Sequence, residues 1–204
     1  MEIRGNSCSN GTEALAIFID YHNLEGSLRH EGTLVDVSAL TDYLARGRRL
    51  LETFVYVGFN PNNLDGDHHF HHLLKTDGFL VRTKLAKVRP DGSLKCDLDI
   101  EMVLDVTDYV HRAKPEIVLL ITGDGDFVPL VAWLRLRGVR VEVASTPRSI
   151  SQDLREAANG YVDLCKAIEE IERGRGEFSR EEVSRNGNGS AQRQAGGDST
   201  HGDG

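Results

Sequence analysis

Residues Ile117–Val131 read IVLLITGDGDFVPLV, and this stretch decides how the rest of the chain is interpreted. The run Ile117–Ile121 is apolar and rich in branched side chains, as in a short strand buried on both faces. Two aspartates, Asp124 and Asp126, follow it on either side of a glycine, and an apolar helical pattern comes next. A buried strand that ends in two carboxylates indicates a polar site at the carboxyl edge of a parallel sheet.

The flanking sequence alternates in the same way between strand-like and helix-like segments. Short apolar runs predict strands over residues 14–20, 50–59, 79–88 (an edge strand), 116–122 and 139–145. Helical spacing with glycine or proline stops predicts helices over residues 37–47, 64–78, 96–114, 127–137, about 149–158 and 164–173. This alternation predicts an α/β fold with a mainly parallel sheet and helices on both faces. In a 3-2-1-4-5 strand order, Asp20 and Asp124 meet at the point where the strand order reverses.

Length and composition predict one folded domain with polar ends. At 39% hydrophobic residues, the 204-residue chain has enough apolar material for one core. We expect a flexible N-terminus over residues 1–13, a folded domain over residues 14–173 and a disordered tail over residues 174–204, which is rich in Gly, Ser, Asn and Gln.

Charge and cysteine content limit the function classes. A net charge of −8 argues against broad electrostatic attraction to nucleic acid. Bound divalent cations, however, reverse the sign of the local charge at an acidic site, so a nuclease is not excluded. The three cysteines are far apart in sequence, which argues against a disulfide framework or a structural zinc site. No run is long enough for a membrane span and the first residues are too polar for a signal peptide, so we expect a cytoplasmic protein without a membrane partner.

Carboxylates recur where strands end and helices begin. Asp20 closes the first strand, Asp97 and Asp99 open the helix over residues 96–114, and Asp124 and Asp126 follow the fourth strand. Neighbouring carboxylates repel one another unless a cation or a proton intervenes, and Mg²⁺ and Mn²⁺ prefer oxygen ligands. Such a metal lowers the pKa of a bound water and stabilises charge on a scissile phosphate. Alternatively, Asp99 or Asp126 taken alone is explained by helix capping, whereas Asp20 is harder to explain as a structural residue.

Three motifs carry a resemblance to a known family. They are FIDYHNL (Phe18–Leu24), KCDLDIEMVLD (Lys95–Asp105) and TGDGDFVPLV (Thr122–Val131). They resemble the patterns D-x-x-N, K-G-x-V-D-V with a later Asp, and [ST]-G-D-x-D-F-x-P of the LabA-like branch of the NYN domains, which are relatives of the PIN-domain ribonucleases. The middle motif departs from the pattern, with Cys96 in place of glycine and an additional carboxylate at Asp97. Both Asp97 and Asp99 are therefore candidate ligands, and the spacing to Asp105 favours Asp99.

The resemblance implies a three-layer α/β/α, PIN-like sandwich and a ribonuclease that depends on Mg²⁺ or Mn²⁺. It implies a catalytic, metal-binding cluster made of Asp20, Asp99, Asp124 and Asp126. It also implies supporting or substrate-binding roles for Asn23, which orients a ligand or a phosphate, and for Thr122, which donates a hydroxyl. Asp105 lies on the same helical face as Met102, so we expect it either to support the cluster or to point to solvent.

Three further features stay open on the sequence alone. The histidines of the helix over residues 64–78 either bind a transition metal or form a solvent-facing surface; they are His68, His69, His71 and His72. Basic residues around the third strand either contact phosphates or protect an edge strand; they are Arg82, Lys84, Lys87, Arg89 and Lys95. Trp133 is interpreted as a core residue or as part of a homodimer surface.

The sequence therefore predicts a metal-dependent endoribonuclease acting on single-stranded or structured RNA, with water as the nucleophile. The alternative is an RNA-binding or regulatory module of the same fold with little or no turnover. A third interpretation, a phosphatase with an aspartyl nucleophile, requires a second aspartate two residues after Asp20, and that position is His22.

Overall fold

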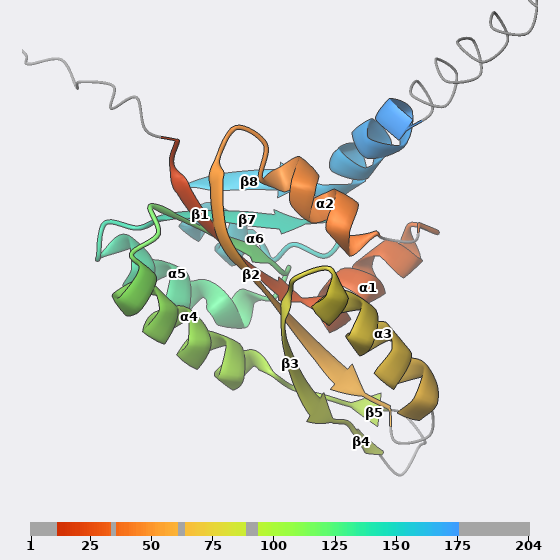
Figure 1. The fold of residues 1–204 in the computed structure, drawn as a ribbon. Coiled ribbons are helices and arrows are strands. Elements are labelled where there is room, and N and C mark those ends of the chain that lie inside the picture. The colour runs from red at the N-terminus through yellow and green to blue at the C-terminus, as the bar shows by residue number, and fades with distance from the viewer. Residues whose placement is uncertain (1–11, 34–35, 61–63, 89–93, 176–204) are drawn as a thin grey trace, which may run out of the picture.

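A computed structural model describes residues 12–33, 36–60, 64–88 and 94–175, and it shows an α/β fold (Figure 1). Most of the expected flexible N-terminus and C-terminal tail lies outside the described residues, as does the expected turn over residues 89–93. Within the described ranges, no helix is long and apolar enough to cross a bilayer.

The centre of the fold is a six-stranded, all-parallel sheet with the order β3-β2-β1-β6-β7-β8. The strands are β1 (Ala14–Asp20), β2 (Arg49–Phe59), β3 (Leu80–Leu85), β6 (Ile117–Ile121), β7 (Arg140–Ser145) and β8 (Gly160–Asp163). The predicted 3-2-1-4-5 order is confirmed for the five predicted strands. Because Ile19 of β1 pairs with Ile121 of β6, the residues that follow both strands lie side by side at the carboxyl edge.

Helices cover both faces of the sheet, as Figure 1 shows. One face packs against α1 (Tyr21–His30), α2 (Val37–Leu44), α3 (Leu64–Thr76) and a helix over residues 164–175. The other face packs against α4 (Asp99–Ala113), α5 (Val128–Arg135) and α6 (Gln152–Ala157). Alternate residues of β1 divide between the two cores, so Ile17 and Ile19 face the first group and Ala16 and Phe18 face the second.

The structure also contains elements that the sequence did not predict. α1 follows Asp20 at once, and its polar sequence with an internal Gly26 concealed it. β8 is only four residues long and half-buried throughout. The expected strand over residues 79–88 divides into β3 and β4 (Lys87–Val88), and β4 pairs antiparallel with β5 (Leu94–Lys95).

Trp133 is half-buried against the second core. The Arg137 guanidinium lies 3.6 Å from the centre of its ring, and His111 meets it edge-on. Trp133 therefore lies at the edge of the second core, and a homodimer stays a prediction.

Candidate functional site

Carboxylates from separate parts of the chain line one pocket at the carboxyl edge of the sheet. The pocket has a volume of about 240 Å³. Its walls come from the end of β1, the start of α1, the end of β2, the segment before α4 and the loop after β6; the lining residues are Asp20, His22, Asn23, Tyr56, Gly58, Cys96, Asp97, Leu98, Asp99 and Asp124. Three of the four predicted metal ligands therefore face one space.

A hydrogen-bond network fixes Asp20 between β1 and β6. Its Oδ1 accepts the backbone N–H of Asn23 at 3.1 Å, and its Oδ2 accepts the Thr122 hydroxyl at 3.3 Å. The Asn23 side-chain oxygen accepts the N–H of Gly123 at 2.9 Å, which ties α1 to the loop after β6. Asn23 and Thr122 thus connect the carboxylate-bearing segments, and their roles at a site stay a prediction.

Asp124 and Asp126 differ in their positions. Asp124 lines the pocket and begins a short 3₁₀ helix (Gly125–Phe127) because its Oδ1 accepts the Asp126 N–H at 2.9 Å. Asp126 is exposed and is not among the residues that line the pocket. The structure therefore brings Asp20, Asp99 and Asp124 together in one pocket, and Asp126 lies outside this pocket.

Glycines in this loop allow close approach of another chain segment. A Cβ on Gly123 would lie 2.3 Å from the carbonyl oxygen of Ser149, and a Cβ on Gly125 would lie 2.8 Å from the hydroxyl of Ser151. Neither glycine is among the residues with positive φ in the described ranges. Close packing against the segment before α6 explains these glycines, and the 3₁₀ helix itself needs no unusual backbone conformation. The buried side chains of Phe127, Leu130, Val131 and Leu134 anchor the following helix in the second core.

The segment before α4 brings two further carboxylates to the pocket. Asp97 and Asp99 both line it, and Asp97 Oδ1 accepts the Asp99 N–H at 3.3 Å. Leu98 stands at the cap position of α4, so Asp99 does not cap this helix with its side chain. Burial, followed by the charges of Asp97, Asp20 and Asp124, raises the pKa of Asp99 to about 6. Burial also raises the pKa of Asp20, against the lowering effect of its bonds from Asn23 and Thr122.

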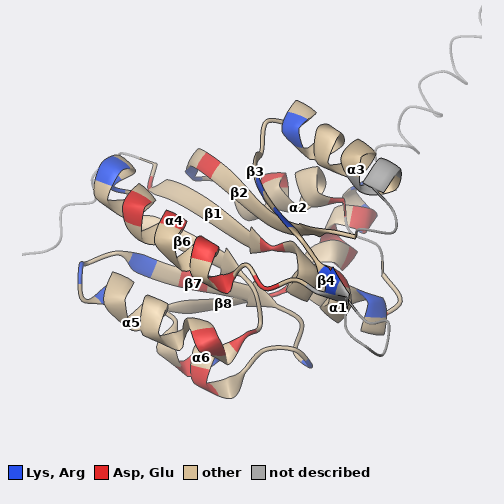
Figure 2. Ribbon diagram, turned by 90° about the horizontal axis from the view of Figure 1, so that it is seen from below, with Lys and Arg blue, Asp and Glu red and all other residues tan. Residues whose placement is uncertain are grey.

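Asp105 does not line the pocket but contacts a residue that does. Its carboxylate accepts the Tyr56 hydroxyl at 3.1 Å and two N–H groups of Arg82 at 2.8 and 3.1 Å. Lys84, two residues along β3, bonds the Glu101 carboxylate at 2.7 Å and the Asp97 carbonyl oxygen at 2.8 Å. In Figure 2 the blue of β3 and β4 accordingly lies beside the red at the start of α4. Arg82 and Lys84 therefore position α4 against the sheet. Arg89 and the Lys95 side chain lie outside the described residues.

The histidines of α3 do not assemble a metal site. The buried His71 ring meets Phe59 edge-on at 4.0 Å between ring centres, and the His68 ring lies at 5.0 Å from the same ring. His69 and His72 are exposed. Over the described ranges, no three His, Cys, Asp or Glu side chains form a group that could hold a metal ion. The carboxylates of the acidic pocket likewise line one space, but among the described residues no three of them converge on a single point.

A second and larger pocket adjoins the acidic one and was not predicted. It has a volume of about 580 Å³ and shares His22, Gly58 and Cys96 with its neighbour. Rings of Tyr21, Phe59 and Phe70 contribute to its walls, together with Arg29 and Glu25. The only hint of this pocket in the sequence is the position of Tyr21 and His22 directly after Asp20. This hint could be interpreted only with knowledge that these residues begin helix α1.

Replacing Asp99 with asparagine is expected to stabilise the metal-free protein at neutral pH. The pKa of Asp99 in the folded state, about 6, lies above that of an unfolded aspartate, about 3.9. Its contribution to stability is therefore full below about pH 4 and is lost as pH rises through 6. Because the group is partly exposed, we expect a gain of roughly 1 kcal/mol at pH 7.5 and about half of that gain at pH 5.

Urea unfolding in EDTA at both pH values measures this effect. The exposed Asp126→Asn variant serves as the control, since it lies outside the pocket. A stability difference between Asp99→Asn and wild type that is the same at pH 5 and pH 7.5 would contradict the assignment of a raised pKa.

Comparison with known proteins places this site in a family. Residues 14–165 match the NYN domain. The chain is 32% identical over 159 residues to the "Low amplitude and bright protein LabA" of Synechococcus elongatus, an alignment covering 74% of this chain and 83% of that protein. A crystal structure of a protein of unknown function from Vibrio parahaemolyticus is similar, with a TM-score of 0.64 and 30% identity over 76% of this chain and 95% of that chain. NYN domains are generally nucleases. With this match across most of its length and the expected sandwich of helices and parallel sheet, the chain belongs to the NYN domain family.

Proposed function

We propose that this protein is a metal-dependent endoribonuclease that hydrolyses RNA phosphodiester bonds in the acidic pocket. The observation that carries the proposal is the placement of Asp20, Asp99 and Asp124, from three separate segments, around one space of about 240 Å³. The raised pKa of Asp99, caused first by burial and then by the neighbouring carboxylates, supports it, because a bound cation would stabilise these charged groups. Membership of a family that generally contains nucleases points to the same chemistry.

The donor set of the pocket suits Mg²⁺ or Mn²⁺. Its charged groups are carboxylates, which are the ligands that these hard cations prefer, and Asp20, Asp99 and Asp124 would hold the ion. Such an ion would lower the pKa of water and neutralise charge developing on the phosphate. Thr122 and Asn23 keep the Asp20 carboxylate oriented toward the pocket, and Asp97 adds a further negative charge next to Asp99.

The adjoining aromatic pocket would receive the nucleotide next to the scissile phosphate. Tyr21 and Phe70 pack at 4.9 Å between ring centres, and both line this larger space. Aromatic side chains beside a phosphate site are typical of proteins that bind unpaired nucleotides by stacking. Arg29 also lines this pocket, where it bonds Glu25 at 2.9 Å, and its remaining N–H groups would contact the sugar–phosphate backbone.

Replacing Tyr21 with leucine is expected to weaken RNA binding about 10-fold, because stacking of one base on an aromatic ring contributes ~1–3 kcal/mol. Fluorescence anisotropy with a short single-stranded RNA in EDTA measures the change. Tyr43→Leu is the control, since Tyr43 lies on α2 and bonds Glu170 on the helix over residues 164–175. Equal affinity of Tyr21→Leu and wild type would exclude the aromatic pocket as a base site.

A second candidate is an RNA-binding module with little or no turnover. One observation favours it: within the described ranges, no three ligating side chains close around a single point. The two proposals differ in the fate of RNA at the acidic pocket, since a binding module leaves the strand intact.

The discriminating experiment incubates end-labelled single-stranded RNA and DNA with purified protein in Mg²⁺, Mn²⁺ or EDTA. The nuclease proposal expects internal cleavage of RNA in at least one cation and intact RNA in EDTA. Binding without cleavage under every condition would support the binding module instead. DNA cleavage that equals RNA cleavage would contradict the assignment of RNA as the substrate.

A further inference from the structure

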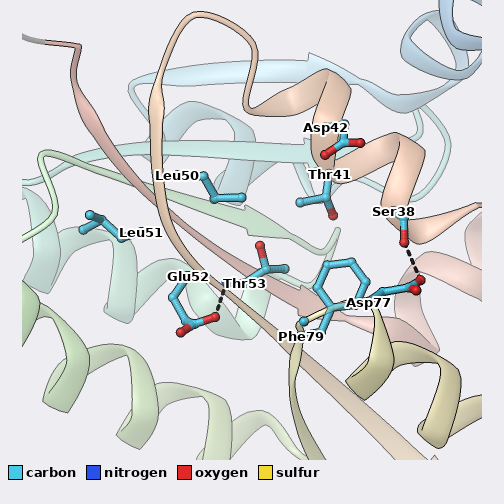
Figure 3. Close-up of a pocket in the computed structure, with 10 residues that line it drawn as sticks. Ser38, Thr41, Asp42, Leu50, Leu51, Glu52, Thr53, Asp77 and Phe79 are labelled. Atoms are coloured by element: carbon cyan, nitrogen blue, oxygen red, sulfur yellow. Dashed lines mark hydrogen bonds between the residues drawn. The ribbon is translucent and has the colours of Figure 1, made fainter.

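A separate cavity opens near the start of β2, at the opposite end of this strand from the acidic pocket (Figure 3). Its volume is about 370 Å³, within the range of small-molecule sites. The cavity exists because β3 pairs only with residues 54–59 of β2, while residues 50–53 line the space. α2 and the turn after α3 complete the walls; the lining residues are Ser38, Thr41, Asp42, Leu50, Leu51, Glu52, Thr53, Asp77, Gly78 and Phe79.

Two buried hydroxyls in this cavity have no hydrogen-bond partner among the described residues. Thr41 of α2 is 2% exposed and Thr53 of β2 is 3% exposed, and the Oγ1 atom of each is without a partner. Figure 3 shows both hydroxyls directed into the space between α2 and β2. Buried polar groups are almost always hydrogen-bonded, because the loss of water is otherwise uncompensated. Two such groups lining one cavity indicate a polar group that completes their hydrogen bonds.

The charge of the lining determines the sign of that group. Asp42, Glu52 and Asp77 contribute three carboxylates, and the lining contains no Lys, Arg or His. Ser38 donates to Asp77 at 2.6 Å and the Thr53 N–H donates to Glu52 at 3.2 Å, so both carboxylates keep further acceptor capacity. An anion would be repelled from this cavity, whereas a cation with several N–H donors matches its acceptors.

The remaining walls are apolar. Leu50 and the nearly buried Phe79 border the same space, so a ligand here meets apolar surface beside the acceptors. An ammonium group offers three donors, and a short carbon chain attached to it would cover the apolar wall. Phe79 adds an aromatic ring, which attracts cations.

We propose that this cavity binds a small aliphatic ammonium compound. Its ammonium group bonds the Thr41 and Thr53 hydroxyls and a carboxylate of Asp42 or Asp77, and its methylene chain packs on Leu50 and Phe79. The site is independent of the acidic pocket, with which it shares no lining residue.

Isothermal titration calorimetry with 1,4-diaminobutane in 150 mM salt tests the proposal on the full chain. We expect a dissociation constant below about 1 mM and a loss of about 10-fold on Thr53→Val, since each hydrogen bond to a charged group contributes this much. The Thr41→Val/Thr53→Val double variant is expected to lose binding further. Both variants are expected to raise the melting temperature of the free protein, because each removes an unpartnered buried hydroxyl.

Two controls separate this site from other acidic surfaces. Asp20→Asn is expected to bind the diamine as wild type does, since Asp20 lies in the other pocket. Succinate, which has the same chain length and the opposite charge, is expected not to bind. The proposal is overturned by absent diamine binding, by equal affinity of the double variant and wild type, or by loss of binding in Asp20→Asn.

Discussion

Replacing Asp124 with asparagine is expected to lower the rate of RNA cleavage by a factor of about 10²–10³, the usual cost of removing one group that stabilises charge in a transition state. The change removes a negative charge from the acidic pocket and keeps an oxygen that can accept the Asp126 N–H. The 3₁₀ helix after β6 is therefore expected to stay intact, so the loss of cleavage rate reports on the removal of the Asp124 negative charge. Single-turnover cleavage of labelled RNA at saturating Mn²⁺ measures it.

Asp126→Asn is the matched control for this experiment. The two aspartates are two residues apart in one loop, but only Asp124 lines the pocket, whereas Asp126 is exposed. We expect Asp126→Asn to cleave at the wild-type rate. An equal loss in both variants would bring Asp126 into the catalytic cluster, as the family resemblance implied, and full activity of Asp124→Asn would contradict the proposed site.

Replacing Gly123 with alanine is expected to destabilise the fold by about 3 kcal/mol, because overpacking against backbone cannot be relieved by a rotamer change. A Cβ at this position would lie 2.3 Å from the Ser149 carbonyl oxygen and 2.7 Å from the Ser149 carbonyl carbon. The loop would have to shift away from residues 149–151, which breaks the bond from the Ser151 N–H to the Gly123 oxygen at 2.8 Å. Urea unfolding monitored by circular dichroism measures the loss.

Gly26→Ala provides a matched comparison in α1. No atom lies within 4 Å of a Cβ built on Gly26, and the residue sits inside a helix. Alanine is better than glycine there by about 0.5–1 kcal/mol, so this variant is expected to be more stable than wild type. If Gly123→Ala were as stable as Gly26→Ala, close packing would not be the reason for Gly123.

The pairing of β1 with β6 was predicted because a 3-2-1-4-5 order explains why two strands end in carboxylates at the point where the strand order reverses. Once these strands are neighbours, Asp20 and Asp124 must share the carboxyl edge. The sequence could not predict α1, since Asp20 acts at once as the last residue of a strand and the cap of a helix. Capping and membership of the acidic pocket are therefore compatible roles for Asp20 and Asp124.

Other features depend on contacts between distant elements. The partners of Asp105 are Arg82 on β3 and Tyr56 on β2, and no local pattern connects these residues. The distinction between Asp124, which caps the 3₁₀ helix, and Asp126, which lies within it, depends on the direction of each side chain, which spacing alone does not give. The cavity at Thr41 and Thr53 depends on where β3 stops pairing with β2, which is a matter of register.

We propose that Asp20, Asp99 and Asp124 together hold a divalent cation that supports RNA hydrolysis. The most direct test of this proposal is the rate of RNA cleavage as a function of Mn²⁺ concentration for wild type and Asp20→Asn. We predict saturable activation of wild type, no cleavage in EDTA, and loss of activation in Asp20→Asn. Cleavage that continues in EDTA, or activation of Asp20→Asn by Mn²⁺ at the wild-type concentration and rate, would contradict the claim.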